Sequence, residues 1–328
     1  MATLNGALRS LAAAQRRAQR ERERHARESA KLYKQQLKQQ EFQNNYEASS
    51  HYESYISLIQ SLHKYSSDTI GWYEIKNEAS PVKPEEYNSR EIQSAQRLKN
   101  YKPTFFEKLF GLKKRLINLE NDLLKAKELD RQQNESQLEN YNREFAEWEY
   151  ENKLAIGIIE RVPEYYKEVI NYYEPFSEIT SLGSQVSLNF NKEYVTVELY
   201  VKNEEIVPNF NLSLTSSGKL SKKNLPISKR NEIYQDYVCS AVLRVAREIY
   251  AHLPVTHVYI NAIGEMLNSS TGYIENQVIL SAIIPGETIQ KLNFSSIDAS
   301  DSMKNFIHNM KFSKTNGFLP VEKVEYIK

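Results

Sequence analysis

The chain has 328 residues, and its 43 lysine and arginine residues nearly balance its 42 aspartate and glutamate residues, giving a formal net charge of +1. This length allows two domains of ordinary size, the single Cys239 excludes an intramolecular disulfide and fits a reducing compartment, and the mean hydropathy of −0.63 predicts much exposed helix. No run approaches the roughly 18 apolar residues that span a bilayer, and the N-terminus lacks the apolar core of a signal peptide, so we expect a cytoplasmic protein without a transmembrane segment.

The N-terminal part is strongly basic. Residues 1–45 hold ten lysine and arginine residues against four glutamates, a net of +6, so the other residues carry a net of −5. The segment from Ala7 to Asn45 contains no proline or glycine and is rich in helix formers, which predicts one long polar helix. About half of its positive charge faces a carboxylate four residues away, which favours a solvated helix held by its own ion pairs. The alternative is binding to nucleic acid or an acidic partner through the freer cations, which are Arg16, Arg20 and Lys31.

A second helical segment completes an N-terminal region over residues 1–78. Its apolar residues recur three or four apart at Tyr52, Tyr55, Ile56, Ile59 and Leu62. Residues 79–103 then read as a connector followed by a short helix, because Pro81 and Pro84 disfavour helix before them, Pro84 can begin a helix, and Pro103 ends it.

The clearest periodicity predicts a rod over residues 104–162. Leucines follow a strict three-four alternation from Leu109 to Leu123, typical of a coiled coil or a helical hairpin. The seam is polar at residues 130–137 and resumes one residue out of phase at Leu138. No glycine or proline lies in this gap, which favours a continuous helix over a turn. A helix this long needs a partner along it, either the N-terminal helices folding back or a second copy of the chain.

The C-terminal part predicts a helical linker over residues 163–190 and an α+β sandwich over residues 191–328, in the order β-β-α-β-β-α. Residues 194–201 alternate as a strand, and we expect residues 210–214 to pair antiparallel with it. An amphipathic helix is predicted over residues 231–252, and a final helix begins near Ser300 and runs to Met310. Two buried strands, at 258–263 and 278–284, flank a turn at 268–272.

Three segments resemble a family of bacterial proteins that have a long helical N-terminal region and no assigned activity: TFFEKLFG, IYQDYVCSAVLRVARE and NFIHNMKFSKTNGF. The resemblance implies a bacterial origin and carries over no functional residue.

A second basic run lies between the predicted second strand and the long helix. Residues 218–230 carry five cations and no acid, and backbone amides at the start of the following helix would favour a phosphate. A solvated loop is the favoured interpretation, and an anion-binding site is the alternative. The cations are Lys219, Lys222, Lys223, Lys229 and Arg230.

Catalysis has only weak candidates. Glu198 on the polar face of a strand, with Asp236 or Glu248 on the long helix, would supply the carboxylates that a metal-dependent nuclease needs. Cys239 and His252 are about 20 Å apart along one helix, which excludes a thiol–imidazole pair there and favours a buried thiol. We predict no metal site and no cofactor.

The predicted function is therefore non-enzymatic. We expect a protein that assembles with itself or a protein partner through its helices and carries a C-terminal domain that recognises an anionic ligand. The alternative is a nucleic-acid-binding protein or metal-dependent nuclease component, in the setting of bacterial phage defence.

Overall fold

The computed structural model describes Arg24, residues 27–29, Lys31, and residues 45–105, 111–216, 219–268 and 270–325. These residues form two compact units: unit 2 is Gly71–Ile159, and unit 1 combines the described residues up to Ile70 with those from Glu160 onward. Most of the predicted basic helix, with Arg16 and Arg20, lies outside the described residues. Within the described parts of the chain, no helix is both long enough and apolar enough to cross a membrane.

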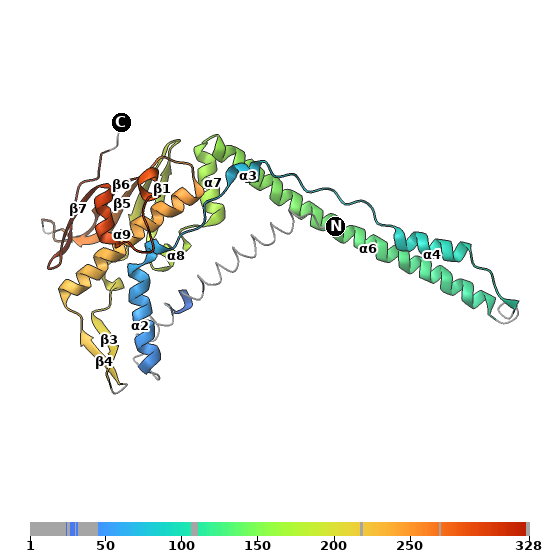
Figure 1. Ribbon diagram of the computed structural model, residues 1–328, viewed down its shortest axis with the longest axis horizontal. Coiled ribbons are helices and arrows are strands. Elements are labelled where there is room, and N and C mark those ends of the chain that lie inside the picture. The colour runs from blue at the N-terminus through green and yellow to red at the C-terminus, as the bar shows by residue number, and fades with distance from the viewer. Residues whose placement is uncertain are drawn as a thin grey trace. The chain divides into compact units, whose positions relative to one another are not determined.

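Unit 2 is built on one long helix, α6 (Leu112–Ile159), of 48 residues. The helix passes through residues 130–137 without a break, as the favoured interpretation expected. The chain that precedes it, comprising α3 (Trp72–Lys76), an extended connector and α4 (Ser89–Lys99), lies along α6 (Figure 1). The apolar seam of α6 is thus covered by the chain's own residues 72–99.

Polar residues in the seam of α6 bind the backbone of the extended connector. Asn134 accepts a hydrogen bond from Tyr87 N and donates one to Tyr87 O, at 2.7 and 2.9 Å. Trp148 Nε1 donates to Glu78 O at 3.0 Å, and Asn152 Nδ2 donates to Lys76 O at 2.8 Å. An extended chain has no internal backbone hydrogen bonds, so these side chains supply partners that a purely apolar seam would not.

The interruption at residue 130 also explains how α4 begins. Asn88, the residue before the helix, makes no capping bond with its side chain. Instead, the buried carboxylate of Asp130 accepts hydrogen bonds from Glu91 N at 2.9 Å and from Arg90 Nη1 at 3.1 Å. A carboxylate near the first turn of a helix satisfies a free N–H group and interacts favourably with the helix dipole.

Replacing Asp130 should therefore loosen unit 2. We predict that Asp130→Ala lowers the free energy of unfolding by about 1–3 kcal/mol, because Arg90 and the Glu91 amide both lose a buried partner. The two tryptophans of the chain, Trp72 and Trp148, both lie in unit 2, so urea unfolding followed by tryptophan fluorescence measures this loss.

The matched control is Glu128→Ala, two residues before Asp130 on the same helix. It removes an exposed carboxylate that binds Arg131 and Gln132. Exposed ion pairs contribute little to stability, so its effect should be much smaller. Equal losses in the two variants would contradict a capping role for Asp130.

Unit 1 begins with α2 (Asn45–Gln60) and a 3-10 turn, η1 (Leu62–Lys64). The predicted stripe is largely confirmed, since Tyr52, Tyr55, Ile59 and Leu62 are all buried. Tyr52 and Tyr55 also donate their hydroxyls to the carbonyls of Phe210 and Ile206.

A six-stranded mixed sheet is the centre of unit 1, with strand order β1-β2-β5-β6-β7-β8. β2 is parallel to β5, and all other neighbours are antiparallel. The expected strands near 194–201, 258–263 and 278–284 are all present. The six strands are β1 (Gln185–Phe190), β2 (Tyr194–Tyr200), β5 (His257–Leu267), β6 (Ile274–Pro285), β7 (Ile307–Ser313) and β8 (Gly317–Leu319).

Three predictions for unit 1 were wrong. Residues 210–214 form β3 (Phe210–Leu214) but do not pair with β2. They form a separate hairpin with β4 (Leu220–Asn224). The antiparallel partner of β2 is β1. The basic run is therefore strand β4 and the first turn of α9 (Ile227–His252), not a loop. The final helix is only α11 (Ala299–Ser302) and η3 (Met303–Asn305), and β7 follows.

The errors on the basic run and on the final helix have local causes. In the hairpin, β4 pairs with β3 over residues 220–224, and Lys222 lies over the Phe210 ring at 4.1 Å. Asp298, rather than Ser300, caps the last helix by accepting from Asp301 N, and Ile307, Asn309 and Lys311 alternate with partly covered residues as in a strand. The linker at 163–190 is helical only in part: α7 (Pro163–Tyr173) and α8 (Ser177–Ser181) lead into β1.

Helix α9 packs on the sheet (Figure 1). It contacts β5 and β8 of the sheet, and it also contacts α2, η1 and α11. Residues 237–246 are consecutively buried, so the helix is not amphipathic over its middle as predicted. A helix apolar on all sides is expected where it is enclosed on all sides.

The other face of the sheet carries a polar row. Glu198, Asn261, Ser281 and Asn309 are direct neighbours on β2, β5, β6 and β7. The C-terminal segment 321–325 binds this row: Val324 N donates to Ser281 Oγ at 2.9 Å, Asn309 Nδ2 donates to Glu322 O at 2.9 Å, and Lys323 Nζ pairs with Glu198 Oε1 at 2.8 Å. These bonds tie the last described residues across the sheet.

Candidate functional site

The three carboxylates considered for catalysis are not brought together. Glu198 lies on the sheet face away from α9. Asp236 and Glu248 are both on α9, twelve residues and about 18 Å apart along the helix axis. Among the described residues, no three histidine, cysteine, aspartate or glutamate side chains are grouped as metal ligands.

Each of these carboxylates already has partners. Glu198 binds Lys323 and Tyr200, and the hydrogen bond from Lys323 lowers the pKa of Glu198. Asp236 accepts from Gln60 Nε2 at 2.7 Å, and burial raises the pKa of Asp236. Glu248 is fully buried and belongs to the network described below.

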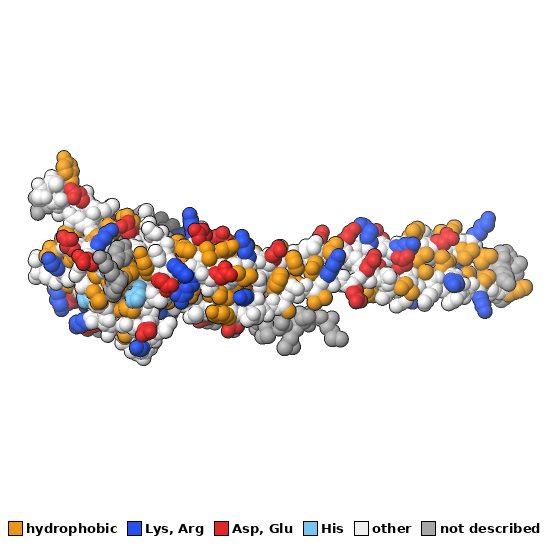
Figure 2. Space-filling model, turned by 90° about the horizontal axis from the view of Figure 1, so that it is seen from above, with side chains coloured by type: hydrophobic (Ala, Val, Ile, Leu, Met, Phe, Trp, Pro, Cys, Tyr) orange, Lys and Arg blue, Asp and Glu red, His pale blue; other side chains and the backbone are white. Residues whose placement is uncertain are grey.

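The basic residues of the 218–230 run are spread over β4 and the start of α9. Lys222 lies over the Phe210 ring at 4.1 Å, Lys229 pairs with Glu232 at 3.1 Å, and Arg230 donates to Glu204 O at 3.0 Å. Lys219 and Lys223 are exposed, as is Lys31. On the face of the molecule in Figure 2, acidic and basic side chains are interspersed.

Cys239 is fully buried, and burial raises the pKa of its thiol, as expected for an unreactive cysteine. Its Sγ lies 3.9 Å from Met310 Sδ, between α9 and the sheet.

A serine–histidine contact on the other side of α9 is also structural. His63 Nδ1 is 2.8 Å from Ser240 Oγ, and His63 Nε2 is 3.3 Å from Ile297 O. Because a carbonyl can only accept, Nε2 carries the proton and Nδ1 accepts from Ser240. Ser240 has no exposed surface, so its hydroxyl cannot meet a substrate.

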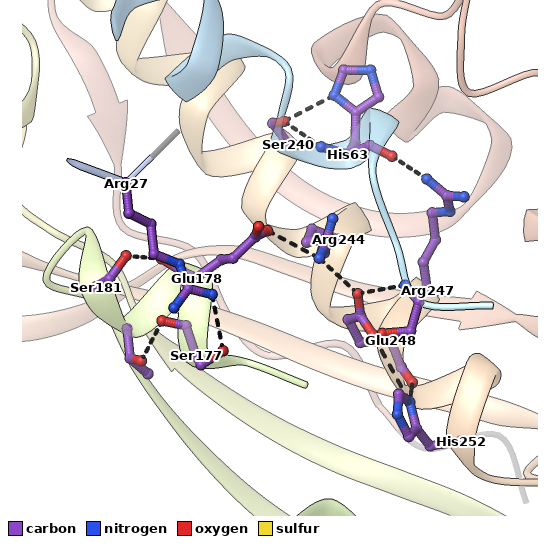
Figure 3. A network of polar contacts seen from close by, with 12 residues as sticks. Arg27, His63, Ser177, Glu178, Ser181, Ser240, Arg244, Arg247, Glu248 and His252 are labelled. Carbon is purple, nitrogen blue, oxygen red and sulfur yellow. Dashed lines mark hydrogen bonds and ion pairs between the residues drawn. The ribbon is translucent and has the colours of Figure 1, made fainter. Parts of the chain in front are cut away.

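The most unusual group in unit 1 is Arg244, a buried guanidinium in the middle of α9. Its Nη2 pairs with Glu248 Oε1 on the next helical turn at 2.9 Å and with Glu178 Oε2 on α8 at 3.0 Å (Figure 3). Ser67 N also donates to Glu248 Oε1, at 3.0 Å. The side chains of Arg244 and Glu248 are only 4% and 0% exposed, so this is a desolvated ion pair.

The network is short of acceptors. Arg244 Nε and Nη1 are buried without a hydrogen-bond partner, and so is Nε of Arg27, whose Nη2 donates to Ser177 Oγ at 3.1 Å. Only one acceptor in the same network, Glu248 Oε2, lacks a hydrogen-bond partner. Unpaired buried donors are costly, so this imbalance makes the network the candidate site of unit 1.

The arginines that carry these donors line a cavity of about 330 Å³, although the unpaired nitrogens themselves have almost no exposed surface. Arg24, Arg27 and Arg244 contribute to its lining, with Glu178 and Asp68 as acidic residues. The α7–α8 turn, where Glu174 adopts a left-handed conformation (φ 45°), supplies part of the wall. The volume lies at the lower end of the range for small-molecule sites.

Aromatic rings form another part of the lining. Tyr172 and Tyr173 are edge to face with centroids 5.0 Å apart, and Tyr173 lies 5.3 Å from the His252 ring. His252 Nδ1 donates to Glu248 O at 2.7 Å, which fixes its orientation, and burial lowers the pKa of His252.

Sequence reasoning named Glu248 but missed Arg244 and Arg27 as members of one site. The available signal was that Arg244 is the one charged residue in the helical segment 237–246, with Glu248 four residues on. A charge in such a segment, paired at i,i+4, predicts a buried ion pair. The contribution of Arg27 depends on a contact with Ser177 across 150 residues, and that of Glu178 on its ion pair with Arg244, 66 residues later.

No protein-family model, no curated protein and no solved structure matches the chain. The site is therefore interpreted from its own geometry.

The two buried histidines predict a pH-dependent stability. Burial lowers the pKa of both His63 and His252, so each binds a proton more readily in the unfolded chain, where its pKa is about 6.5. The free energy of unfolding should therefore be highest above pH 6.5. It should fall as the pH decreases from there towards the lowered pKa values, by up to about 1.4 kcal/mol per pH unit for each histidine.

Urea titrations at pH 7.5 and 5.5, followed by near-ultraviolet circular dichroism, measure this change. His252→Asn should reduce the difference between the two pH values, whereas His257→Gln, outside this network, should leave it unchanged. If the free energy of unfolding changes as much between the two pH values in His252→Asn as in the parent, His252 does not contribute to the pH dependence.

Proposed function

We propose that this chain is a non-enzymatic recognition protein whose unit 1 binds an oxyanion, such as a phosphate or carboxylate group, in the Arg27–Arg244 cavity. The observation that carries the proposal is the set of unpaired buried donors, Arg27 Nε, Arg244 Nε and Arg244 Nη1, beside a cavity. Guanidinium groups match the geometry of oxyanions and remain charged at all relevant pH values.

The carboxylates around Arg244 are consistent with this role. Glu178 and Glu248 both use the same nitrogen, Nη2, which holds the guanidinium in place and leaves its other N–H groups for a ligand. Burial strengthens such charge-assisted bonds relative to those made in water. The anion site expected on the 218–230 run is less well supported, because three of its five cations already contact other groups.

A metal-dependent nuclease, the alternative expected from the sequence, has no specific observation in its favour, since Glu198, Asp236 and Glu248 lie apart. Nucleic-acid binding or a part in phage defence stays a prediction.

Isothermal titration calorimetry with inorganic phosphate tests the oxyanion site. Arg27→Gln should weaken binding at least about tenfold, because it removes a charged donor while preserving the Arg244 ion pairs. Arg244→Lys, which keeps the charge but lacks the Nε and Nη1 donors, should also weaken binding. Circular dichroism confirms that each variant is folded.

Lys304→Gln is the control, since Lys304 is exposed, pairs with Asp301 and does not belong to the cavity lining. It should leave phosphate binding unchanged. If the parent protein binds neither phosphate nor acetate at low ionic strength, or if Arg27→Gln and Lys304→Gln bind alike, the proposal is wrong.

The helical unit is proposed to provide assembly. Ile117, Leu124 and Leu138 on α6 are 54%, 64% and 42% exposed and lie at heptad intervals, with Arg131 at the intervening position. Such spacing keeps side chains on one face, as in helices that pair with another helix. Leu138 belongs to the predicted seam, yet all three side chains stay exposed beside residues 72–99.

Sedimentation velocity over a concentration series tests self-association. The triple variant Ile117→Ser, Leu124→Ser, Leu138→Ser should sediment more slowly than the parent at the same concentration, whereas Glu139→Ser, one residue beyond Leu138, should not. A parent protein that stays monomeric at every concentration would contradict self-association.

A further inference from the structure

The cavity beside Arg244 is larger than an oxyanion needs. At about 330 Å³ it has room for on the order of ten water molecules at ~30 Å³ each, several times the space of one phosphate group. Arg27 and Arg244 form only part of its lining. A ligand that fills the cavity therefore carries more than the oxyanion.

The remaining lining is suited to a flat, apolar group. Ile70 and Pro175 line the cavity together with the rings of Tyr172 and Tyr173. Tyr172 lines the cavity and is 43% exposed. The edge-to-face contact with Tyr173, at an interplanar angle of 87°, restrains its orientation before any ligand arrives.

Polar acceptors accompany the rings. Asp68 and Glu174 line the same cavity and bring carboxylate oxygens that can accept from amino or hydroxyl groups. The lining thus combines cationic donors, an aromatic surface and acceptors, a combination that suits a ligand with an anionic end and a planar, hydrogen-bonding end.

From this arrangement we infer that the ligand is an oxyanion joined to a planar ring, the chemistry of a nucleoside monophosphate. This inference rests on the proposed oxyanion site and adds the class of ligand. Arg27 and Arg244 bind the phosphate, and Tyr172 stacks on the ring. Stacking of a base on an aromatic side chain contributes appreciably to affinity and tolerates different bases.

Calorimetry with four probes tests the inference on the full chain: inorganic phosphate, ribose 5-phosphate, phenyl phosphate and AMP. AMP should bind about tenfold more tightly than ribose 5-phosphate, and phenyl phosphate should bind more tightly than inorganic phosphate. Tyr172→Leu should reduce AMP binding to the level of ribose 5-phosphate and leave inorganic phosphate unchanged. Tyr172→Phe, which keeps the ring, should bind AMP like the parent.

The outcomes separate this inference from the oxyanion site. If phosphate binds and depends on Arg27, but AMP binds no better than ribose 5-phosphate or Tyr172→Leu binds AMP normally, the ring-binding role is overturned and the oxyanion site stands. If none of the four probes binds, both fail.

Discussion

Unit 1 depends on a helix that has no exposed face. From Tyr237 to Ala246, α9 is enclosed by the sheet and by α2, η1 and α11, so its polar side chains must find partners inside the protein. Ser240 binds His63, and Arg244 binds Glu178 and Glu248. The candidate site is thus a consequence of burying this helix: carboxylates hold the one guanidinium in the segment by a single nitrogen, and Arg244 lines the cavity.

The structure of unit 2 depends on a different constraint, because an extended segment packs along helix α6. Extended backbone must hydrogen-bond to something when it is covered. Asn134, Trp148 and Asn152 serve this need on α6, and Asp130 binds the first turn of α4. The polar interruption of the heptad pattern at residues 130–137 thus binds Tyr87 and the start of α4.

The features that follow from local pattern could be predicted from the sequence. Alternation identified β2, apolar runs identified β5 and β6, and the lack of glycine or proline favoured a continuous α6. Pairing could not be predicted in the same way: β1 precedes β2 by a tight connection, but nothing in its sequence distinguishes it from β3 as the partner of β2. The candidate site could not be predicted from the sequence either, because tertiary contacts bring Arg27, Glu178 and Arg244 to one cavity. Only Arg244 had a signal in the sequence, as the one charged residue of an otherwise uncharged helical segment.

Unit 1 is discontinuous in the chain, since α2 packs against α9 and Gln60 binds Asp236, 176 residues later. During synthesis at about 5–20 residues per second, the apolar face of α2 therefore waits roughly 9–35 seconds for its partner. Unit 2 is continuous in the chain, from Gly71 to Ile159, so it can form while unit 1 is still incomplete. The order of translation thus separates the folding of the two units in time. During this interval the apolar face of α2 would need protection by a chaperone on the ribosome.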